Sequence, residues 1–342
     1  MVYSFLRSAA TPSSRNPRLL LSLVLFVLFS DNLHFVNAMS LLPKGNKVID
    51  SHLHVWANKK ESATQFPYSE GGEPPESLQD VASTSSLLEQ MDQNGVDGSL
   101  IVQPINHKFD HSYVLNAIKT HPNRFKGMLL FDPSLPTEDA ITTLEDLTLK
   151  GFVGVRFNPY LWPSTGEKQW VPMSKPNSSG LAVYKRCGEL NMPVGVMCFQ
   201  GLQYHYDDIV ELLKASPDTT LILDHFGFTA LSPEGDEAFE KLLSLSTYPQ
   251  VIIKVSALFR LNDDTSGFER VRTERFIPLL EKFGSNRLMF GTDFPFVLEQ
   301  EPEKYDGTIQ LVSSKSWIEN EQDRIAIMGG TAERIFGPWG RK

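Results

Sequence analysis

Two histidines separated by one residue are the sharpest chemical signal in the sequence. They are His52 and His54, in the run DSHLH at positions 50–54. The apolar residues around them predict a strand, and side chains two apart on a strand point to the same side. Two imidazoles placed in this way can bind a metal ion or polarise a substrate. An isolated His-x-His pair is more often structural, so its meaning depends on where the strand ends.

Two later apolar runs also end in titratable side chains. His225 follows the run LIL at 221–223, and Asp293 follows the run LMFG at 288–291. Taken singly, a core histidine and an aspartate that caps a turn explain them equally well. If all three runs are strands of one parallel barrel, their carboxyl ends meet at one rim. Three histidines and one carboxylate then converge there.

This set of side chains suits hydrolysis. Asp293 is the predicted general base, which takes a proton from water while a cation or imidazolium stabilises the oxyanion that forms at the attacked carbonyl. A Zn²⁺-like ion would also lower the pKa of bound water from 15.7 to about 7. The candidate ligands of such an ion, and the candidate catalytic residues, are His52, His54, His225 and Asp293.

Cationic and aromatic side chains near other strand ends are candidates for binding the substrate. Arg156 is a permanent charge in an apolar strand, and burying it without an anion would be costly. It is interpreted as a clamp for a substrate carboxylate or oxyanion, with a structural ion pair as the alternative. Arg260 and Lys254 are further candidates of this kind. Tyr160 is a candidate for the pocket wall, with ordinary packing as the alternative.

The elements that must position these residues alternate regularly. From Lys47 onward, eight short β-rich runs are each followed by a longer amphipathic run. The expected strands are 47–56, 97–104, 125–132, 152–159, 192–200, 219–226, 251–259 and 287–294. The expected helices lie near 84–95, 111–121, 137–150, 178–190, 206–215, 235–246, 268–283 and 305–317.

Such alternation predicts a parallel sheet, because parallel strands need long connections. Eight repeats close naturally into a (β/α)8 barrel, also called a TIM barrel. An open doubly wound sheet is the alternative, but the Gly-x-Gly-x-x-Gly turn that would support it is missing after the first strand. The segment 61–80, which contains Pro and Gly, is expected to be a long loop at the substrate mouth.

Composition limits the partners. The chain of 342 residues has a formal net charge of −9, and its Lys and Arg are scattered, so nucleic acid is not an expected partner. The two cysteines, Cys187 and Cys198, are expected on a helix and in a strand, the first solvated and the second in the core. They therefore give no disulfide framework.

Residues 1–38 differ from the rest and are expected to be a targeting segment that is removed. No acidic residue precedes Asp31, and three arginines lead into the apolar run 19–29. That run is too short to span a bilayer comfortably, so no stable membrane span is expected after processing. Cleavage after Ala38 would suit a secretory signal, whereas the long Ser- and Arg-rich start suits a transit peptide. Targeting to the secretory pathway and to a plastid or other organelle are both left open.

Four motifs together resemble the amidohydrolase-related family of the amidohydrolase superfamily. They are HLH at 52–54, VRFN at 155–158, DHFG at 224–227 and GTDFP at 291–295. The resemblance extends over 47–337 as a single domain, and is strongest to the branch of 2-pyrone-4,6-dicarboxylate lactonase-like and sugar-lactonase-like enzymes. It implies a distorted (β/α)8 barrel whose strand-eight aspartate activates water. It also implies a small-molecule substrate, a lactone or similar cyclic carbonyl compound, often carboxylated.

One departure from the family pattern concerns the metal. Many metal-dependent members of the superfamily carry a lysine or histidine ligand on strands four and five, whereas the fifth strand here reads PVGVMCFQ at 193–200. The resembled branch includes enzymes that work without a divalent metal. One Zn-like ion and metal-independent catalysis therefore both stay open, and Cys198 is a further candidate as a soft ligand. A nonoxidative decarboxylase and a catalytically silent barrel with a binding role are the alternatives to a hydrolase.

Overall fold

The computed structural model describes residues 41–299 and 304–340. The expected targeting segment, 1–38, lies outside these residues. Among the residues described, no helix is long and apolar enough to cross a bilayer.

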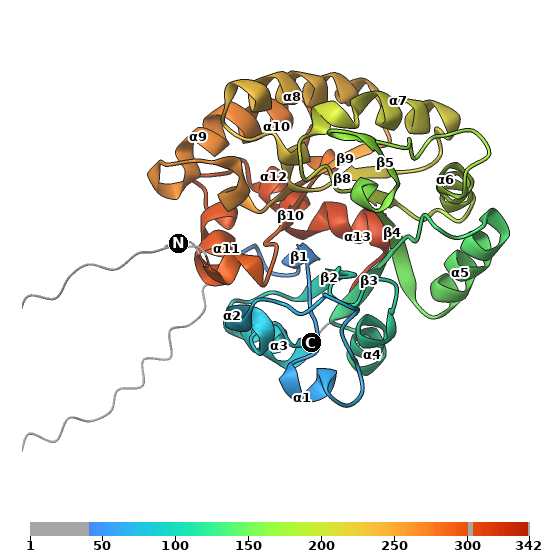
Figure 1. Cartoon of the computed structure of the whole chain (residues 1–342). Helices are drawn as coiled ribbons and strands as arrows, with labels where there is room; N and C mark the ends of the chain where they lie inside the picture. Colours follow the sequence, from blue (N-terminus) through green and yellow to red (C-terminus); the bar gives the residue numbers. More distant parts are fainter. Residues whose placement is uncertain (1–40, 300–303, 341–342) are drawn as a thin grey trace, which may run out of the picture. The chain divides into compact units, whose positions relative to one another are not determined.

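Eight parallel strands form one sheet, each hydrogen-bonded to the next along the chain (Figure 1). The apolar strands are covered on both faces, which is typical of parallel sheets. For example, all six residues of β9 (Val251–Ser256) are buried. All eight strands confirm the sequence prediction. They are β1 (Ile49–Leu53), β2 (Gly98–Val102), β3 (Phe125–Leu130), β4 (Phe152–Phe157), β7 (Val194–Val196), β8 (Leu221–Leu223), β9 (Val251–Ser256) and β10 (Leu288–Gly291).

The sheet closes on itself just beyond the ends of β1 and β10. Leu53 and Phe294 form an isolated parallel bridge. On either side of it, the Asp293 amide donates to the His52 carbonyl at 2.9 Å, and the His54 amide donates to the Phe294 carbonyl at 2.7 Å. The predicted (β/α)8 barrel is therefore confirmed. Its closing seam runs through three of the four candidate catalytic residues.

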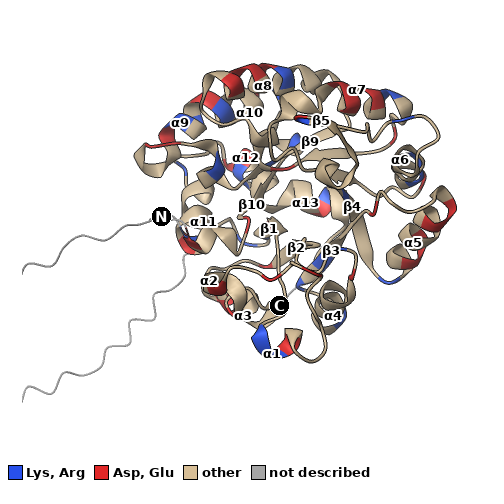
Figure 2. Cartoon of the chain, viewed as in Figure 1, with Lys and Arg blue, Asp and Glu red and all other residues tan. Residues whose placement is uncertain are grey.

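The expected helices surround the barrel and begin and end close to the predicted positions. They are α3 (Thr84–Gln93), α4 (Ser112–Thr120), α5 (Thr137–Leu149), α6 (Ser179–Glu189), α7 (Tyr206–Ala215), α8 (Pro233–Ser244), α10 (Ile277–Phe283) and α11 (Tyr305–Ser313). Both acidic and basic side chains lie on α8 and α9 (Glu269–Val271) at the outer surface (Figure 2). Cys187 is buried on the inner face of α6, so the prediction that it is solvated was wrong; Cys198 is buried as expected.

The helix expected over 268–283 is present from Glu269 to Phe283, but it contains a π-helical turn that was not predicted. The segment consists of α9, a π-helical turn over Arg272–Phe276, and α10. Pro278 explains the widened turn, because proline has no N–H to donate to the carbonyl four residues earlier.

Several elements were not predicted. The segment after β4 contains an antiparallel hairpin of β5 (Ser164–Gly166) and β6 (Gln169–Trp170). The loop expected over 61–80 is flanked by the one-turn helix α1 (Lys59–Ser62) and contains a second, α2 (Glu76–Gln79). After α11 the chain forms α12 (Glu321–Ile325) and α13 (Thr331–Phe336).

The C-terminal segment packs against the inside of the barrel. Ala332 and Phe336 of α13, together with Trp339, join a buried cluster with inward side chains of the strands, such as Leu100. Gly98 at the start of β2 permits this packing, since a Cβ there would lie 2.3 Å from the Trp339 ring. Because these residues fill the amino-terminal end of the barrel, the opposite end is the one available for chemistry.

Candidate active site

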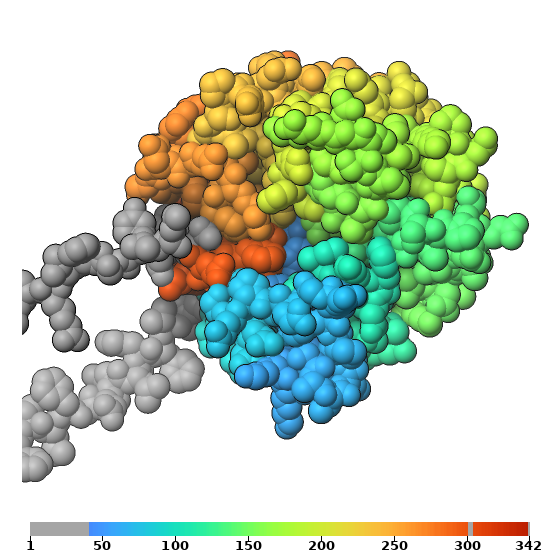
Figure 3. All heavy atoms as spheres, in the orientation of Figure 1, coloured from blue at the N-terminus to red at the C-terminus, as the bar shows by residue number. Residues whose placement is uncertain are grey.

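A cavity of about 330 Å³ opens at the carboxyl ends of the strands. Figure 3 shows a hollow on this face, with atoms from the start of the described chain, coloured blue, visible at its floor. Its polar lining residues come from the carboxyl ends of different strands and the segments that follow them, and are His54, Asn106, Arg156, Asn158, His225, Arg260 and Asp293. Its apolar lining residues are Trp56, Pro104, Ile105, Met197, Phe199, Phe228 and Phe296.

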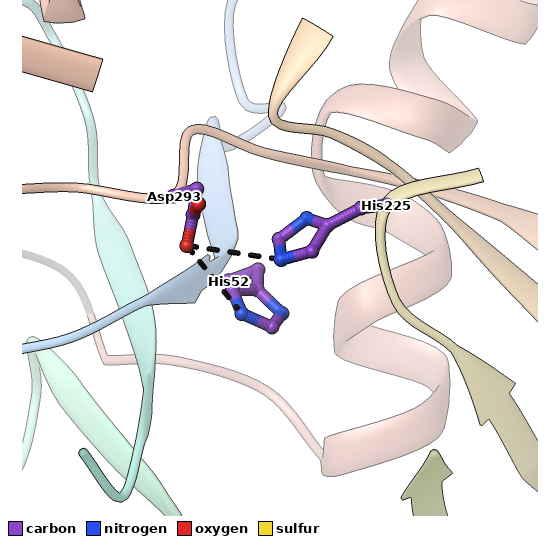
Figure 4. Close-up of side chains that lie close together, drawn as sticks. All are labelled: His52, His225 and Asp293. Atoms are coloured by element: carbon purple, nitrogen blue, oxygen red, sulfur yellow. Dashed lines mark ion pairs between the residues drawn. The ribbon is translucent and has the colours of Figure 1, made fainter. Parts of the chain in front are cut away.

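Three imidazoles surround one oxygen of Asp293. The Nε2 atoms of His52, His54 and His225 lie 3.8, 3.5 and 3.7 Å from Asp293 Oδ1. Figure 4 shows the His52 and His225 rings pointing toward this carboxylate. The structure thus brings together the four side chains that the sequence predicted to converge.

The backbone that carries two of these side chains is strained. Asp293 has a φ of 64° and His225 a φ of 51°, both in the left-handed region that non-glycine residues rarely adopt. His225 starts a short 3₁₀ turn one residue after the end of β8. Such strain persists only where the surrounding structure fixes it, and it is commonest at functional sites. Here it turns both side chains inward over the mouth of the barrel.

Contacts at Nδ1 fix the orientations of the His54 and His225 imidazoles. His54 Nδ1 lies 2.8 Å from the Val102 carbonyl oxygen. Because a carbonyl only accepts hydrogen bonds, Nδ1 carries a proton, and Nε2 is the nitrogen that faces the cavity. His225 Nδ1 lies 2.8 Å from the Ser256 hydroxyl. These contacts hold both Nε2 atoms toward Asp293.

Arg260 holds the other oxygen of Asp293. Its Nη2 and Nε lie 2.8 and 2.9 Å from Asp293 Oδ2. Burial alone would raise the pKa of Asp293, but the neighbouring His225, a hydrogen bond with His54 and the Arg260 charge together hold that pKa well below its usual value. Asp293 is therefore ionised at neutral pH, with Oδ1 left to face the imidazoles.

Burial keeps two of the imidazoles neutral. It lowers the pKa of His225 to about 4. Burial, and next the charge of Lys254, hold the pKa of His52 well below its ordinary value. At neutral pH these two rings are uncharged and can each offer a nitrogen lone pair.

A network of buried charges lies beneath the rings. Asp224 Oδ1 is 3.3 Å from Lys254 Nζ and 3.1 Å from His52 Nδ1, and Asp224 Oδ2 is 3.3 Å from Arg156 Nη2. Arg156 therefore makes the structural ion pair that was the alternative interpretation, and it also lines the cavity, where a role as a substrate clamp stays a prediction. The sequence analysis gave Asp224 no role, although its position directly before His225 at a strand end was a signal that could have been used.

The side chains present fit a divalent ion. Ligand atoms of His52, His225 and Asp293 lie within 4.8 Å of one another. His52 Nε2 is buried and has no hydrogen-bond partner among the described residues. Neutral imidazole nitrogens and a carboxylate oxygen are the donors that zinc takes in hydrolytic sites, and His54 would add a fourth.

The β7 segment contributes no donor to this set. Cys198 is buried in the hydrophobic core, and its neighbours Met197 and Phe199 line the cavity instead. Burial raises the pKa of the Cys198 thiol far above its usual value, which disfavours the thiolate that binds metals. The structure therefore gives no support to Cys198 as a soft ligand.

Tyr160 lies outside the cavity lining, contrary to the expectation that it contacts the substrate. Its hydroxyl accepts from the Gln200 amide at 2.7 Å and lies 3.2 Å from His205 Nε2. Its ring packs edge-on against Trp170. The aromatic walls are instead Trp56, Phe199, Phe228 and Phe296, which sequence reasoning missed because nothing local shows which way an aromatic side chain faces.

Comparisons with known proteins agree with this geometry. The amidohydrolase family model matches residues 49–337. The chain is 26% identical to the 4-sulfomuconolactone hydrolase of Hydrogenophaga intermedia over 315 residues, which cover 89% of this chain and 93% of that protein. It is 32% identical to the L-fucono-1,5-lactonase of Burkholderia multivorans over 166 residues, 42% of this chain and 54% of that protein.

A similar fold is found among solved structures. A probable 2-pyrone-4,6-dicarboxylic acid hydrolase from Acinetobacter baumannii superposes with a TM-score of 0.68 at 22% identity, covering 85% of this chain and 99% of the other. The 2,6-dihydroxybenzoate decarboxylase from Rhizobium gives a TM-score of 0.59 at 17% identity, covering 85% and 98%. At these identities the likeness concerns the fold alone.

Proposed function

Because the chain belongs to the amidohydrolase family, we propose that it is a hydrolase that opens a small anionic lactone with a water activated at Asp293. The observation that carries the proposal is the placement of three imidazole nitrogens around one ionised carboxylate oxygen at the mouth of the barrel. The similarity to a 4-sulfomuconolactone hydrolase over 89% of the chain supports a lactone as the substrate.

Asp293 is suited to hold and deprotonate the attacking water. Arg260 occupies Oδ2, so Oδ1 is the oxygen that accepts the proton. Since the low pKa makes this carboxylate a weak base, the proton moves as the new C–O bond forms rather than before it. A divalent ion, which His52, His54, His225 and Asp293 would hold, supplies a bound water of lower pKa.

The remaining steps follow from the same groups. The water oxygen adds to the lactone carbonyl carbon, and negative charge develops on the carbonyl oxygen next to the cationic side of the cavity. Cleavage of the ring C–O bond releases an alkoxide, which takes the proton from Asp293. The product is the open-chain hydroxy acid, and Asp293 returns to its ionised form.

The cavity lining supports a compact anionic ring as the substrate class. Its volume of about 330 Å³ is at the lower end of the range of ligand sites. Arg156 and Arg260 both line it and can attract a carboxylate or sulfonate. The apolar aromatic walls suit a flat ring better than a polyol, whose hydroxyls each need a partner.

A panel of lactones tests this proposal. Initial rates of acid release would be measured for sulfonated and carboxylated unsaturated lactones and for a neutral sugar lactone, before and after treatment with a chelator. We expect opening of at least one anionic lactone, with a higher kcat/KM than for the neutral one. If no lactone is opened by protein reloaded with Zn²⁺, the proposal is wrong, and release of CO₂ from aromatic acids would identify a decarboxylase instead.

We also propose that residues 1–38 direct the protein out of the cytosol. The arginines, the absence of acidic residues before Asp31 and the apolar run 19–29 support this. A fluorescent protein fused behind residues 1–38 should leave the cytosol, and its arrival in the secretory pathway or in an organelle decides between the two destinations. A fusion that stays cytosolic would contradict the proposal.

A further inference from the structure

The inner side of His52 lies between two opposite charges. Its Nδ1 is 3.1 Å from Asp224 Oδ1 and 3.0 Å from Lys254 Nζ, and those two atoms are 3.3 Å apart. All three side chains have an exposed fraction of 0%. Water therefore cannot screen either neighbour. Which nitrogen of His52 carries the proton depends on the other two members of this buried triangle of His52, Asp224 and Lys254.

A neutral imidazole cannot satisfy both neighbours. It has one N–H and one lone pair, an ionised carboxylate only accepts, and an ammonium only donates. If Nδ1 carries the proton, it donates to Asp224 and faces Lys254 as a second donor. If Nδ1 lacks the proton, it accepts from Lys254 and faces Asp224 as a second acceptor. Asp224 and Lys254 thus favour opposite tautomers of His52.

The surroundings of His52 Nε2, which faces Asp293, determine which tautomer is more stable. His52 Nε2 lies 3.8 Å from Asp293 Oδ1 (Figure 4). In the tautomer that Lys254 favours, Nε2–H points toward this carboxylate, which is attractive. In the tautomer that Asp224 favours, the Nε2 lone pair faces the carboxylate, which is repulsive unless a cation lies between them. Only the second tautomer can coordinate a metal ion.

We propose that Lys254 and Asp224 are opposing positioning residues that set the tautomer of His52 and thereby tune the affinity of the site for a divalent cation. Lys254 stabilises the Nε2–H form in the cation-free protein, and Asp224 stabilises the Nδ1–H form that binds the cation. Cation binding then moves one proton from Nε2 to Nδ1 within the ring, with no net release. The inference uses the side chains of the proposed function but does not depend on the substrate.

Two other contacts keep the triangle in place when one member changes. Arg156 Nη2 lies 3.3 Å from Asp224 Oδ2, so this carboxylate keeps a cationic partner without Lys254. Asp50 Oδ1 accepts from the His52 amide at 3.2 Å and from the Thr292 amide at 2.9 Å, which ties the backbone of His52 to β10. The backbone of His52 is therefore held by contacts that involve neither Asp224 nor Lys254.

The first experiment needs no variant. The protein is labelled with ¹⁵N-histidine and stripped with a chelator, and imidazole ¹⁵N shifts are recorded before and after addition of Zn²⁺; the His52→Gln variant identifies the His52 signals. We expect the Nε2–H form without zinc and the Nδ1–H form with it. The same tautomer in both states would overturn the proposal, as would a failure to bind zinc. Neither result depends on lactone hydrolysis, which is measured separately.

The second experiment uses the opposite signs that the proposal requires. Zinc affinity is measured by competition with a chromophoric chelator for Asp224→Asn and Lys254→Met. We expect Asp224→Asn to weaken binding by about 10- to 100-fold, and Lys254→Met to strengthen it. The exposed Lys119→Met serves as the control. Thermal unfolding shows that each variant is folded. Weaker binding in both variants would indicate a purely structural ion pair and would refute the inference.

Discussion

Removing the ion pair between Arg260 and Asp293 should change two quantities that can be measured separately: the pKa of Asp293 and the KM for an anionic lactone. Replacing Arg260 by glutamine removes the charge that lies 2.8 Å from Asp293 Oδ2. At an effective dielectric constant of about 20, that contact corresponds to an attraction of about 6 kcal/mol. The guanidinium is 26% exposed, and discounting for solvent screening leaves about 2–3 kcal/mol, or about two pKa units on Asp293.

The sign of the effect follows from the direction of the present shift. Arg260 helps to hold the pKa of Asp293 below its usual value, so its removal raises that pKa. The acid limb of the kcat/KM profile should therefore move to higher pH by about two units. Because Arg260 also lines the cavity, KM for an anionic lactone should rise while KM for a neutral lactone stays nearly constant.

Full pH profiles of kcat and KM for both lactones test this reasoning. Arg270→Gln is the matched control, since Arg270 makes an exposed ion pair with Glu274 on the outer surface and such pairs are worth about 0–1 kcal/mol. An acid limb that does not move, together with an equal rise of KM for both lactones, would show that Arg260 neither tunes Asp293 nor attracts the substrate anion.

Three further predictions concern stability and the limits of the site. Gly98→Ala should lower the free energy of unfolding by about 1–3 kcal/mol, because its Cβ would meet the Trp339 ring at 2.3 Å; unchanged urea denaturation would show that the C-terminal segment does not pack tightly in the barrel. His225, with its pKa lowered to about 4, must be neutral in the folded state. Stability should therefore be complete above about pH 6.5 and fall by about 3 kcal/mol from this residue as pH decreases to 4; equal urea midpoints at pH 7 and pH 4.5 would contradict this. Tyr160→Phe should leave kcat/KM unchanged, since the hydroxyl is engaged outside the cavity; a large loss would place Tyr160 in substrate binding after all.

Most of the fold could be predicted because its signals are local. Strands such as β9 are continuous apolar runs between amphipathic segments, and the order of elements leaves few parallel topologies. The positions of His52, His54, His225 and Asp293 at strand ends placed all four at one rim, because the carboxyl ends of parallel strands converge. The π-helical turn before Pro278 and the hairpin after β4 have weaker local signals and were missed.

The inner charge network could not be predicted, because its members are distant in the sequence. Asp224 and His52 are separated by 172 positions, and Lys254 and His52 by 202. A strand pattern shows that a side chain is buried but not which partner it contacts across the barrel. For the same reason Arg156 was left with two interpretations: the structure confirms the ion pair, and the role as a substrate clamp stays a prediction for a side chain that also lines the cavity.

The pre-steady-state rate of lactone opening by Asp293→Asn is the most direct test of the central claim. The substitution keeps the shape of the side chain but removes the oxygen charge that the three imidazoles surround. Compared with wild type and with the exposed Asp218→Asn control, we expect the rate of ring opening to fall by about 10²- to 10⁴-fold, with the fold of the protein intact by circular dichroism. Equal rates of ring opening in the wild type and in Asp293→Asn would contradict the role of this carboxylate.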